Sequence, residues 1–255
     1  MFPLCKYYNT NFRCLLDMRK PIFNLVLVDS YMITPRAKHF IFKLENEEFF
    51  DFIPGQFISF HMDIDNMPVK RSYSIANLYG NKHIEIAATK VDNGVATKLL
   101  YALKPGDMLK TSGPYGRLVM PEELDKRYIF LGTGTGVSPY RSMLPAIKDN
   151  LQKDHKVLIA QGVRYQENLM YSQDFNSLSE HKNYEFRAYY SQEKSDKLDN
   201  FEHKGYVQEW LKELSLCEND HIFVCGSPNM IQDVIKYLDS IEFKGKLYRE
   251  KYYSA

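Results

Sequence analysis

The chain of 255 residues contains only four cysteines, and no two of them form a C-x-x-C pair. This spacing excludes the usual ligand patterns of a built-in iron–sulfur cluster and of a zinc finger. The four are Cys5, Cys14, Cys217 and Cys225. With so few cysteines we expect reduced thiols, which are typical of a cytoplasmic protein.

Long apolar runs and an excess of one charge are also absent from the sequence. It has no apolar run of about eighteen residues or more, and its first residues lack the apolar segment of a signal peptide. The formal net charge is +1, which gives no support to binding of nucleic acid or a membrane surface. We therefore expect a soluble cytoplasmic protein with neither partner. Residues 1–20 are interpreted as an N-terminal extension, with Met18 a candidate start site.

The sequence from 21 to 120 contains short strand-like runs separated by turn signals such as Pro54-Gly55 and Gly113-Pro114. The runs span 23–30, 38–44, 56–62, 71–77, 82–91 and 107–113. This pattern predicts a six-stranded antiparallel barrel, interrupted by one helix at 95–103.

The period of the apolar pattern changes from residue 121 to residue 255. Apolar strands at 128–132, 156–162, 184–190, 221–226 and 246–252 alternate with helical stretches near 138–150, 167–177, 205–214 and 228–240. This alternation predicts a Rossmann-like, mostly parallel sheet with helices on both faces. We place the domain boundary near Pro121 and interpret the charged stretch 191–205 as a surface loop.

The loop Gly132-Thr133-Gly134-Thr135-Gly136 follows the first strand of the predicted parallel sheet. The first strand-to-helix turn of such sheets commonly binds phosphate. Glycines let backbone amides approach an anion, and Ser138 is a candidate N-cap for the following helix, with Pro139 at its first position. The glycine spacing differs from the dinucleotide fingerprint. A tight turn that needs glycine only for its geometry is the alternative.

Two further motifs lie in the barrel half. Arg71-Ser72-Tyr73-Ser74 places a cation, an aromatic ring and a hydroxyl on one strand, although an ordinary strand shows the same alternation. Gly94-Val95-Ala96-Thr97 opens the helix of that half, so its amides and the Thr97 hydroxyl form a second candidate anion site. One anion site in each half suggests two phosphorylated ligands that meet between the domains.

The order of these motifs along residues 22–253 resembles that of the ferredoxin–NADP reductase superfamily. In order, the motifs are "PGQF" (54–57), "RSYS" (71–74), "GVAT" (94–97), "GPYG" (113–116), "GTGTGVSP" (132–139), "GVRYQENLMY" (162–171), "CGSPNM" (225–230) and "REKYY" (249–253). The bacterial ferredoxin or flavodoxin reductases are the most similar branch. The resemblance implies a Greek-key barrel for FAD and a Rossmann-like domain for NADP. It also implies hydride transfer from NADPH to FAD, then single-electron transfer to a separate ferredoxin or flavodoxin. We expect a monomer.

The resemblance also implies a role for each motif at the FAD. Arg71 pairs with the pyrophosphate, Tyr73 packs on the isoalloxazine and Ser74 hydrogen-bonds flavin N5, while the helix end at Gly94 to Thr97 binds the other pyrophosphate oxygens. Tyr252 covers the other face of the flavin, and Tyr253 extends towards the adenine.

The same resemblance places NADP on the loop 132–136. Cys225 and Gly226 border the nicotinamide, and the adenosine end contacts Arg164, Ser191, Gln192, Tyr206 and Gln208. The candidate catalytic residues are Ser74, Cys225, Glu250 and Tyr252, with Glu250 matching the family's carboxylate near flavin N5. A buried structural thiol and a solvated charge are the alternatives for Cys225 and Glu250.

Gln192 departs from the family pattern, because NADP-using relatives often have arginine at this position. A charged hydrogen bond is worth about 1.5–3 kcal/mol, so its loss weakens a preference for NADPH. Tyr206 and Gln208 keep NADPH ahead of NADH, and Arg164 or the lysines at 194, 197 and 204 are candidates to compensate. Two other functions stay open. One is an NADH- or NADPH-dependent flavin or cytochrome reductase; the other is a flavin-binding electron-transfer subunit of a larger complex.

Overall fold

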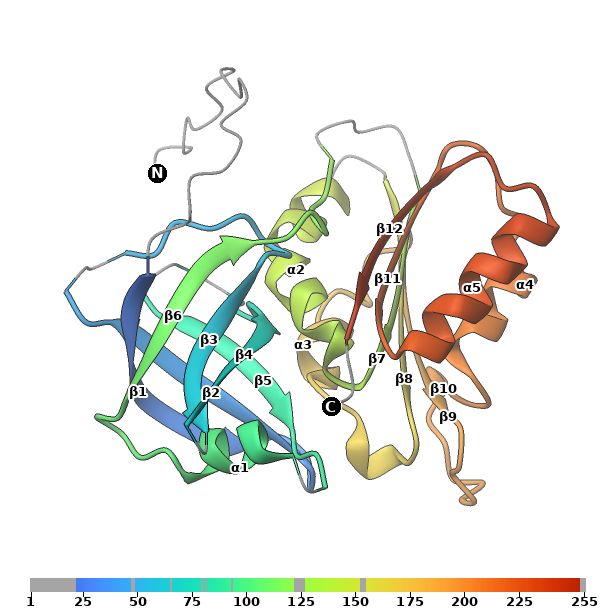
Figure 1. Ribbon diagram of the computed structural model, residues 1–255. Helices are drawn as coiled ribbons and strands as arrows, with labels where there is room; N and C mark the ends of the chain where they lie inside the picture. Colours follow the sequence, from blue (N-terminus) through green and yellow to red (C-terminus); the bar gives the residue numbers. More distant parts are fainter. Residues whose placement is uncertain are drawn as a thin grey trace, which may run out of the picture.

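The computed structural model describes residues 22–252, apart from 47–48, 65, 79, 81, 93, 122–126 and 152–154. The predicted extension 1–20, with Met18, and the predicted FAD contact Tyr253 therefore lie outside the described residues. The described part forms two sheets that stand side by side (Figure 1).

The first sheet is antiparallel. Its strands are β1 (Ile22–Met32), β2 (Ala37–Leu44), β3 (Phe57–Ile64), β4 (Met67–Ser74), β5 (Ile84–Thr89) and β6 (Met108–Tyr115). Their spatial order is β4-β3-β6-β1-β2-β5. An isolated bridge between Ile75 and Ile86 joins the two outer strands and closes the sheet. The predicted six-stranded Greek-key barrel is therefore confirmed.

The barrel is filled by apolar side chains that alternate along its strands. Phe40, Phe42 and Phe60 are fully buried in it, and burial of one such side chain stabilises the fold by about 1.5–3 kcal/mol. Helix α1 (Val95–Ala102) lies at one end of the barrel (Figure 1) and adds Ala96 and Leu100 to the same core. This packing fixes the amino end of α1 against the barrel wall.

The second sheet is parallel. Its strands are β7 (Arg127–Thr133), β8 (Lys156–Val163), β9 (Tyr184–Tyr190), β10 (Glu202–Lys204), β11 (Asp220–Gly226) and β12 (Lys246–Lys251), in the order β10-β9-β8-β7-β11-β12. The chain order reverses between β7 and β11, which is where open sheets of this kind bind ligands. The predicted Rossmann-like sheet is confirmed.

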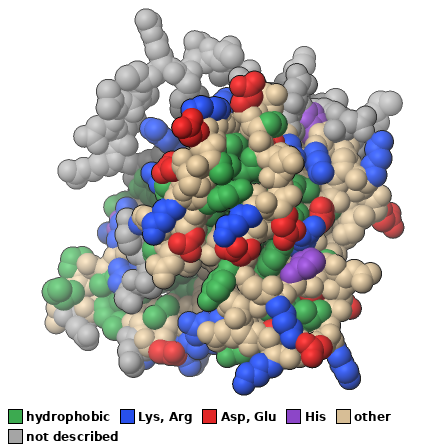
Figure 2. All heavy atoms as spheres, turned by 90° about the vertical axis from the view of Figure 1, so that its right-hand side faces the viewer, with side chains coloured by type: hydrophobic (Ala, Val, Ile, Leu, Met, Phe, Trp, Pro, Cys, Tyr) green, Lys and Arg blue, Asp and Glu red, His purple; other side chains and the backbone are tan. Residues whose placement is uncertain are grey.

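Helices cover both faces of the second sheet, as predicted. Helices α2 (Ser138–Leu151) and α3 (Ser172–Asn176) lie between this sheet and the barrel (Figure 1). Helices α4 (Trp210–Glu213) and α5 (Pro228–Ser240) cover the outer face. On that outer side, Lys and Arg are interspersed with Asp and Glu (Figure 2). None of the described helices is long and apolar enough to cross a membrane.

Three segments differ from the sequence prediction. The stretch 191–205 is not only a loop, because β10 pairs with β9; three residues are too few to show a strand period. The predicted helix at 167–177 is split into a 3-10 turn η2 (Gln166–Asn168) and α3, because Tyr171 between them has a left-handed φ of 56°. The stretch near 205–214 likewise consists of a 3-10 turn η3 (Val207–Glu209) followed by α4.

Candidate active site between the two sheets

The glycine loop joins β7 to α2 at the carboxyl end of the parallel sheet. Gly134–Val137 form a 3-10 turn η1 that runs directly into α2. Ser138 therefore has helical φ and ψ angles of −55° and −46°, and the prediction that it is an N-cap is wrong. In the described ranges no side chain caps η1, so the first amides of this turn can donate to another acceptor.

The glycines of the loop also have a packing role. A Cβ on Gly136 would lie 2.2 Å from the carbonyl oxygen of Cys225, and a Cβ on Gly226 would lie 2.2 Å from the Thr133 hydroxyl oxygen. That hydroxyl accepts a hydrogen bond of 2.8 Å from the amide of Ser227. The loop and the end of β11 therefore touch through backbone and small groups, which brings Thr133, Gly136, Cys225 and Gly226 together.

Three predicted catalytic residues meet at the junction between the sheets. The Ser74 hydroxyl at the end of β4 donates to Glu250 Oε1 at 3.2 Å. The Tyr252 hydroxyl donates to Ser74 Oγ at 2.7 Å and lies 3.4 Å from the carbonyl oxygen of Thr135. Tyr252 therefore reaches both the barrel and the glycine loop.

Cys225 and Glu250 are direct neighbours on β11 and β12. Burial raises the pKa of Glu250 to about 7, although the hydrogen bond from Ser74 lowers it. Burial and the nearby Glu250 carboxylate raise the pKa of the Cys225 thiol well above its usual range. A carboxyl group that titrates near neutral pH is suited to proton exchange, whereas the thiol stays neutral.

The predicted FAD residues of β4 lie along one wall of the barrel. Arg71 is exposed, and its Nη1 donates to the Lys70 carbonyl oxygen at 3.0 Å. The Ser72 hydroxyl lies 2.8 Å from that of Ser59. Tyr73 is half-buried, and burial raises its pKa to about 12. Their contacts with a flavin stay predictions.

The second candidate anion site lies at the amino end of α1. The Thr97 hydroxyl donates to the Gly94 carbonyl oxygen at 3.0 Å and is buried. Within the part of the chain that the structure describes, no side chain caps the helix, so the amides of its first turn are donors for an anion. The site thus depends more on the backbone than on the hydroxyl.

The residues predicted at the adenosine end gather where β8, β9 and β10 end. The Gln192 amide donates to the Arg164 carbonyl oxygen at 2.9 Å, and the Gln192 side-chain oxygen accepts from the Tyr165 hydroxyl at 2.9 Å. Gln208 donates to Asp233 of α5 at 3.1 Å. Ser191 is half-buried, whereas Tyr206 is 61% exposed.

A shallow pocket beside the ends of β8 and β9 is lined by residues that the sequence analysis did not assign to a site. It is lined by Tyr165, Gln166, Glu167 and Glu193. Glu193 accepts hydrogen bonds from the amides of Gln166, Lys194 and Ser195. Two carboxylates in this pocket oppose the binding of a further phosphate. These pocket residues could not be singled out from the sequence, because they lie in polar stretches of a kind that is common in loops.

The donors at the junction fit two phosphorylated cofactors. No side chain among the described residues caps the amino end of α1 or of η1. In addition, Ser138 is 1% exposed, and its hydroxyl has no hydrogen-bond partner among the described residues. Buried polar groups are normally paired, so the Ser138 hydroxyl at the start of α2 lacks a partner that such a group usually has.

Comparison with known proteins agrees with this arrangement. Residues 24–120 match the family "Oxidoreductase FAD-binding domain", and residues 130–236 match "Oxidoreductase NAD-binding domain". The chain is 30% identical over 227 residues to a ferredoxin–NADP reductase of Pseudomonas aeruginosa, covering 80% of this chain and 85% of the relative.

A further relative and a solved structure of the same fold extend the comparison. One subunit of the Na⁺-translocating NADH-quinone reductase of Psychrobacter cryohalolentis is 30% identical over 190 residues, which cover 68% of this chain and 46% of that relative. A ferredoxin NADP⁺ reductase from Neisseria gonorrhoeae, solved with bound FAD and NADP, has a TM-score of 0.76 at 21% identity, covering 90% of this chain and 98% of that one. The chain therefore belongs to the ferredoxin–NADP reductase superfamily and is an oxidoreductase with an FAD-binding and an NAD-binding domain.

Proposed function

We propose that the chain is a ferredoxin/flavodoxin–NADP⁺ reductase that uses FAD. It takes hydride from NADPH and passes single electrons to ferredoxin or flavodoxin. The convergence of Ser74, Glu250 and Tyr252 between the FAD-binding and NAD-binding domains carries this proposal. The similarity to the ferredoxin–NADP reductase of Pseudomonas aeruginosa supports the choice of acceptor.

The residues of the site have separate tasks in this reaction. Arg71 and the amino end of α1 hold the pyrophosphate of FAD, and the loop 132–136 holds the phosphates of NADPH. FAD, when bound, supplies a group that accepts two electrons together and releases them one at a time. Ser74 is held in place by Glu250 and Tyr252, and the carboxyl of Glu250 holds or releases a proton near neutral pH.

NADPH is the proposed reductant, by a modest margin over NADH. Arg164 and the lysines at 194 and 197 are the positive charges that would face the 2′-phosphate at the adenosine end. Lys204 is paired with Asp196 at 2.5 Å, so part of its charge is already neutralised. The preference for NADPH over NADH is reduced by the neutral amide of Gln192 and by the carboxylates of Glu167 and Glu193, which do not attract the 2′-phosphate.

An NADH-dependent reductase is the second candidate function. It is favoured by the similarity to a component of the Na⁺-translocating NADH-quinone reductase. In one form, the chain would be an electron-transfer subunit that needs a partner chain. In another, it would reduce free flavin or a cytochrome.

One series of measurements on the purified chain tests these functions. We expect a flavin spectrum, released FAD, oxidation of NADPH by ferricyanide without a partner chain, and reduction of added ferredoxin or flavodoxin. Turnover that depends on added FMN or riboflavin would instead identify a flavin reductase. Failure to reduce any acceptor without another chain would identify a subunit.

A further inference from the structure

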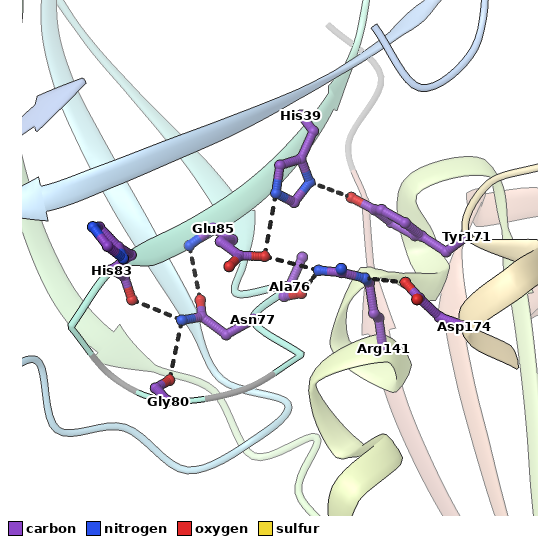
Figure 3. Close-up of polar contacts among 9 residues, drawn as sticks. All are labelled: His39, Ala76, Asn77, Gly80, His83, Glu85, Arg141, Tyr171 and Asp174. Atoms are coloured by element: carbon purple, nitrogen blue, oxygen red, sulfur yellow. Dashed lines mark hydrogen bonds and ion pairs between the residues drawn. The ribbon is translucent and has the colours of Figure 1, made fainter. Parts of the chain in front are cut away.

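A buried polar cluster joins the two domains beside the site, and its central residue is Arg141 of α2. Its Nη1 donates to the Ala76 carbonyl oxygen at 2.6 Å and to Glu85 Oε2 at 2.8 Å, both in the FAD-binding domain. Its Nε donates to Asp174 Oδ2 of α3 at 2.6 Å, in the NAD-binding domain. Arg141 thus binds both domains at once (Figure 3).

A second connection crosses the junction next to the first. The Tyr171 hydroxyl lies 2.7 Å from His39 Nδ1 on β2, and His39 Nε2 lies 3.2 Å from Glu85 Oε2. The Arg141 guanidinium packs over the Tyr171 ring, 4.6 Å from its centroid. These contacts form a closed ring of side chains across the junction (Figure 3).

The cluster is strong because it is both charged and shielded from water. The Arg141 side chain is 11% exposed and that of Glu85 is 20% exposed. Burial raises the pKa of Glu85, but the neighbouring His39 imidazole and the hydrogen bond from Arg141 outweigh it and leave this pKa lowered. Charge-assisted hydrogen bonds are the strongest ones in proteins, and removing one partner leaves the other charge buried and unpaired.

The position of Arg141 couples the cluster to the reacting groups. Ala76 follows Ser74, the last residue of β4, by two positions, and Arg141 lies in the helix that continues the glycine loop. The cluster therefore ties the backbone beside Ser74 to the helix that carries the loop 132–136.

We propose that Arg141 is a positioning residue for hydride transfer, which sets the distance between the flavin at Ser74 and the nucleotide on the glycine loop. It does so by holding Ala76 and Glu85 against α2. The inference rests on the proposed function. Hydride transfer is sensitive to such alignment, since a misplacement of about 1 Å can cost on the order of 100-fold in rate.

The test compares Arg141→Met with Arg187→Met. Arg187 is a close match, because it donates to Glu185 at 2.6 Å and to Glu213 at 2.8 Å and packs 4.6 Å from the Trp210 ring. All of these partners lie in the NAD-binding domain. The control therefore removes a similar cluster without touching the domain junction.

Two readouts separate positioning from general stability. Arg141→Met should slow flavin reduction at saturating NADPH by about tenfold or more, with dissociation constants for FAD and NADP⁺ within about threefold of wild type. Arg187→Met should stay within about twofold. In the cofactor-free protein, hydrogen exchange of the backbone at 74–77 should speed up in Arg141→Met but not in Arg187→Met.

Equal effects of the two variants on rate and exchange would overturn the inference. So would an Arg141→Met protein with wild-type rate and exchange. If Arg141→Met does not fold, Arg141→Lys and Glu85→Gln replace it. Both variants keep a similar side-chain volume but lose the forked ion pair between Arg141 and Glu85. Wild-type rates of flavin reduction in both variants would overturn the inference. A wild-type chain that shows no flavin reduction would refute the proposed function. The exchange experiment would still decide whether Arg141 holds the backbone beside Ser74 against α2.

Discussion

At the scale of single residues, the buried carboxyl of Glu250 predicts how the stability of the protein depends on pH. Its pKa rises from 4.5 to about 7 in the folded protein. Between these pH values the folded chain holds a proton that the unfolded chain has lost, so stability falls as pH rises. The loss amounts to about 3 kcal/mol. Glu250→Gln lacks this titration, so its free energy of unfolding should rise relative to that of the wild type by about 3 kcal/mol as the pH goes from 4.5 to 8. Urea unfolding of the cofactor-free protein measures this difference.

An exposed carboxyl serves as the control for this prediction. Glu218 is exposed, so Glu218→Gln should follow the pH dependence of the wild type. If the difference between Glu250→Gln and wild type does not change with pH, Glu250 has an ordinary pKa and is not held in a buried contact with Ser74.

Cys225 and Glu250 also make a kinetic prediction. Cys225→Ala and Glu250→Gln should slow hydride transfer about tenfold or more, with little loss of FAD affinity, because both residues lie beside the junction rather than on the phosphate donors. Stopped-flow flavin reduction measures this. Cys217→Ala, at an exposed cysteine, is the matched control. Rates within about twofold of wild type would assign both groups a structural role.

Gln192 makes a prediction about cofactor choice. A guanidinium forms a charge-assisted fork to phosphate that an amide does not. The ratio of kcat/KM for NADPH to that for NADH should exceed one in the wild type, and Gln192→Arg should raise this ratio about tenfold or more. An unchanged ratio would place residue 192 away from the 2′-phosphate. A wild-type preference for NADH would overturn the proposed reductant.

At the scale of elements, the contact between the glycine loop and β11 depends on Gly226. Its φ is 132°, and a Cβ there would meet the Thr133 hydroxyl at 2.2 Å. Gly106 also has a positive φ, of 97°, but its Cβ would meet nothing within 4 Å. Gly226→Ala should therefore destabilise the protein by about 1–3 kcal/mol more than Gly106→Ala, measured by urea unfolding.

The comparison of the two alanine variants isolates the steric term. Both carry the cost of a positive φ, and only Gly226→Ala adds a clash. Equal losses in the two variants would mean that the loop moves away from β11 without cost. The close approach would then have no role in shaping the nucleotide site.

At the scale of the whole molecule, FAD should stabilise the chain through its pyrophosphate. Arg71 and the uncapped amino end of α1 supply donors that suit two linked phosphates. FAD at about 100 times its Kd should add about 2.7 kcal/mol of stability. FMN at the same concentration should add less, and Arg71→Ala should weaken FAD retention. Release of FMN from the purified protein, or unchanged FAD affinity in Arg71→Ala, would contradict this assignment.

The two sheets and the glycine loop could be predicted from the sequence, because their signals are local. Alternating apolar residues mark the barrel strands, and apolar strands alternating with helices mark the parallel sheet. Strand β10 was missed because its three residues are held by pairing with β9 rather than by a pattern of their own. Ser138 was misassigned for a related reason: the 3-10 turn before it makes it part of the helix.

The amino-acid sequence was enough to identify the family, the two domains and the glycine loop, since each depends on motifs whose residues lie close together along the chain. The three-dimensional structure was needed to show that Ser74 meets Glu250 and Tyr252, which lie 176 and 178 positions further along. It was also needed to show that burial raises the pKa of Glu250 and that Arg141 joins the domains. The pKa of a buried carboxyl and a contact across the domain junction both depend on which distant residues pack together and exclude water. Tertiary packing decides this, because the residues concerned are far apart along the chain.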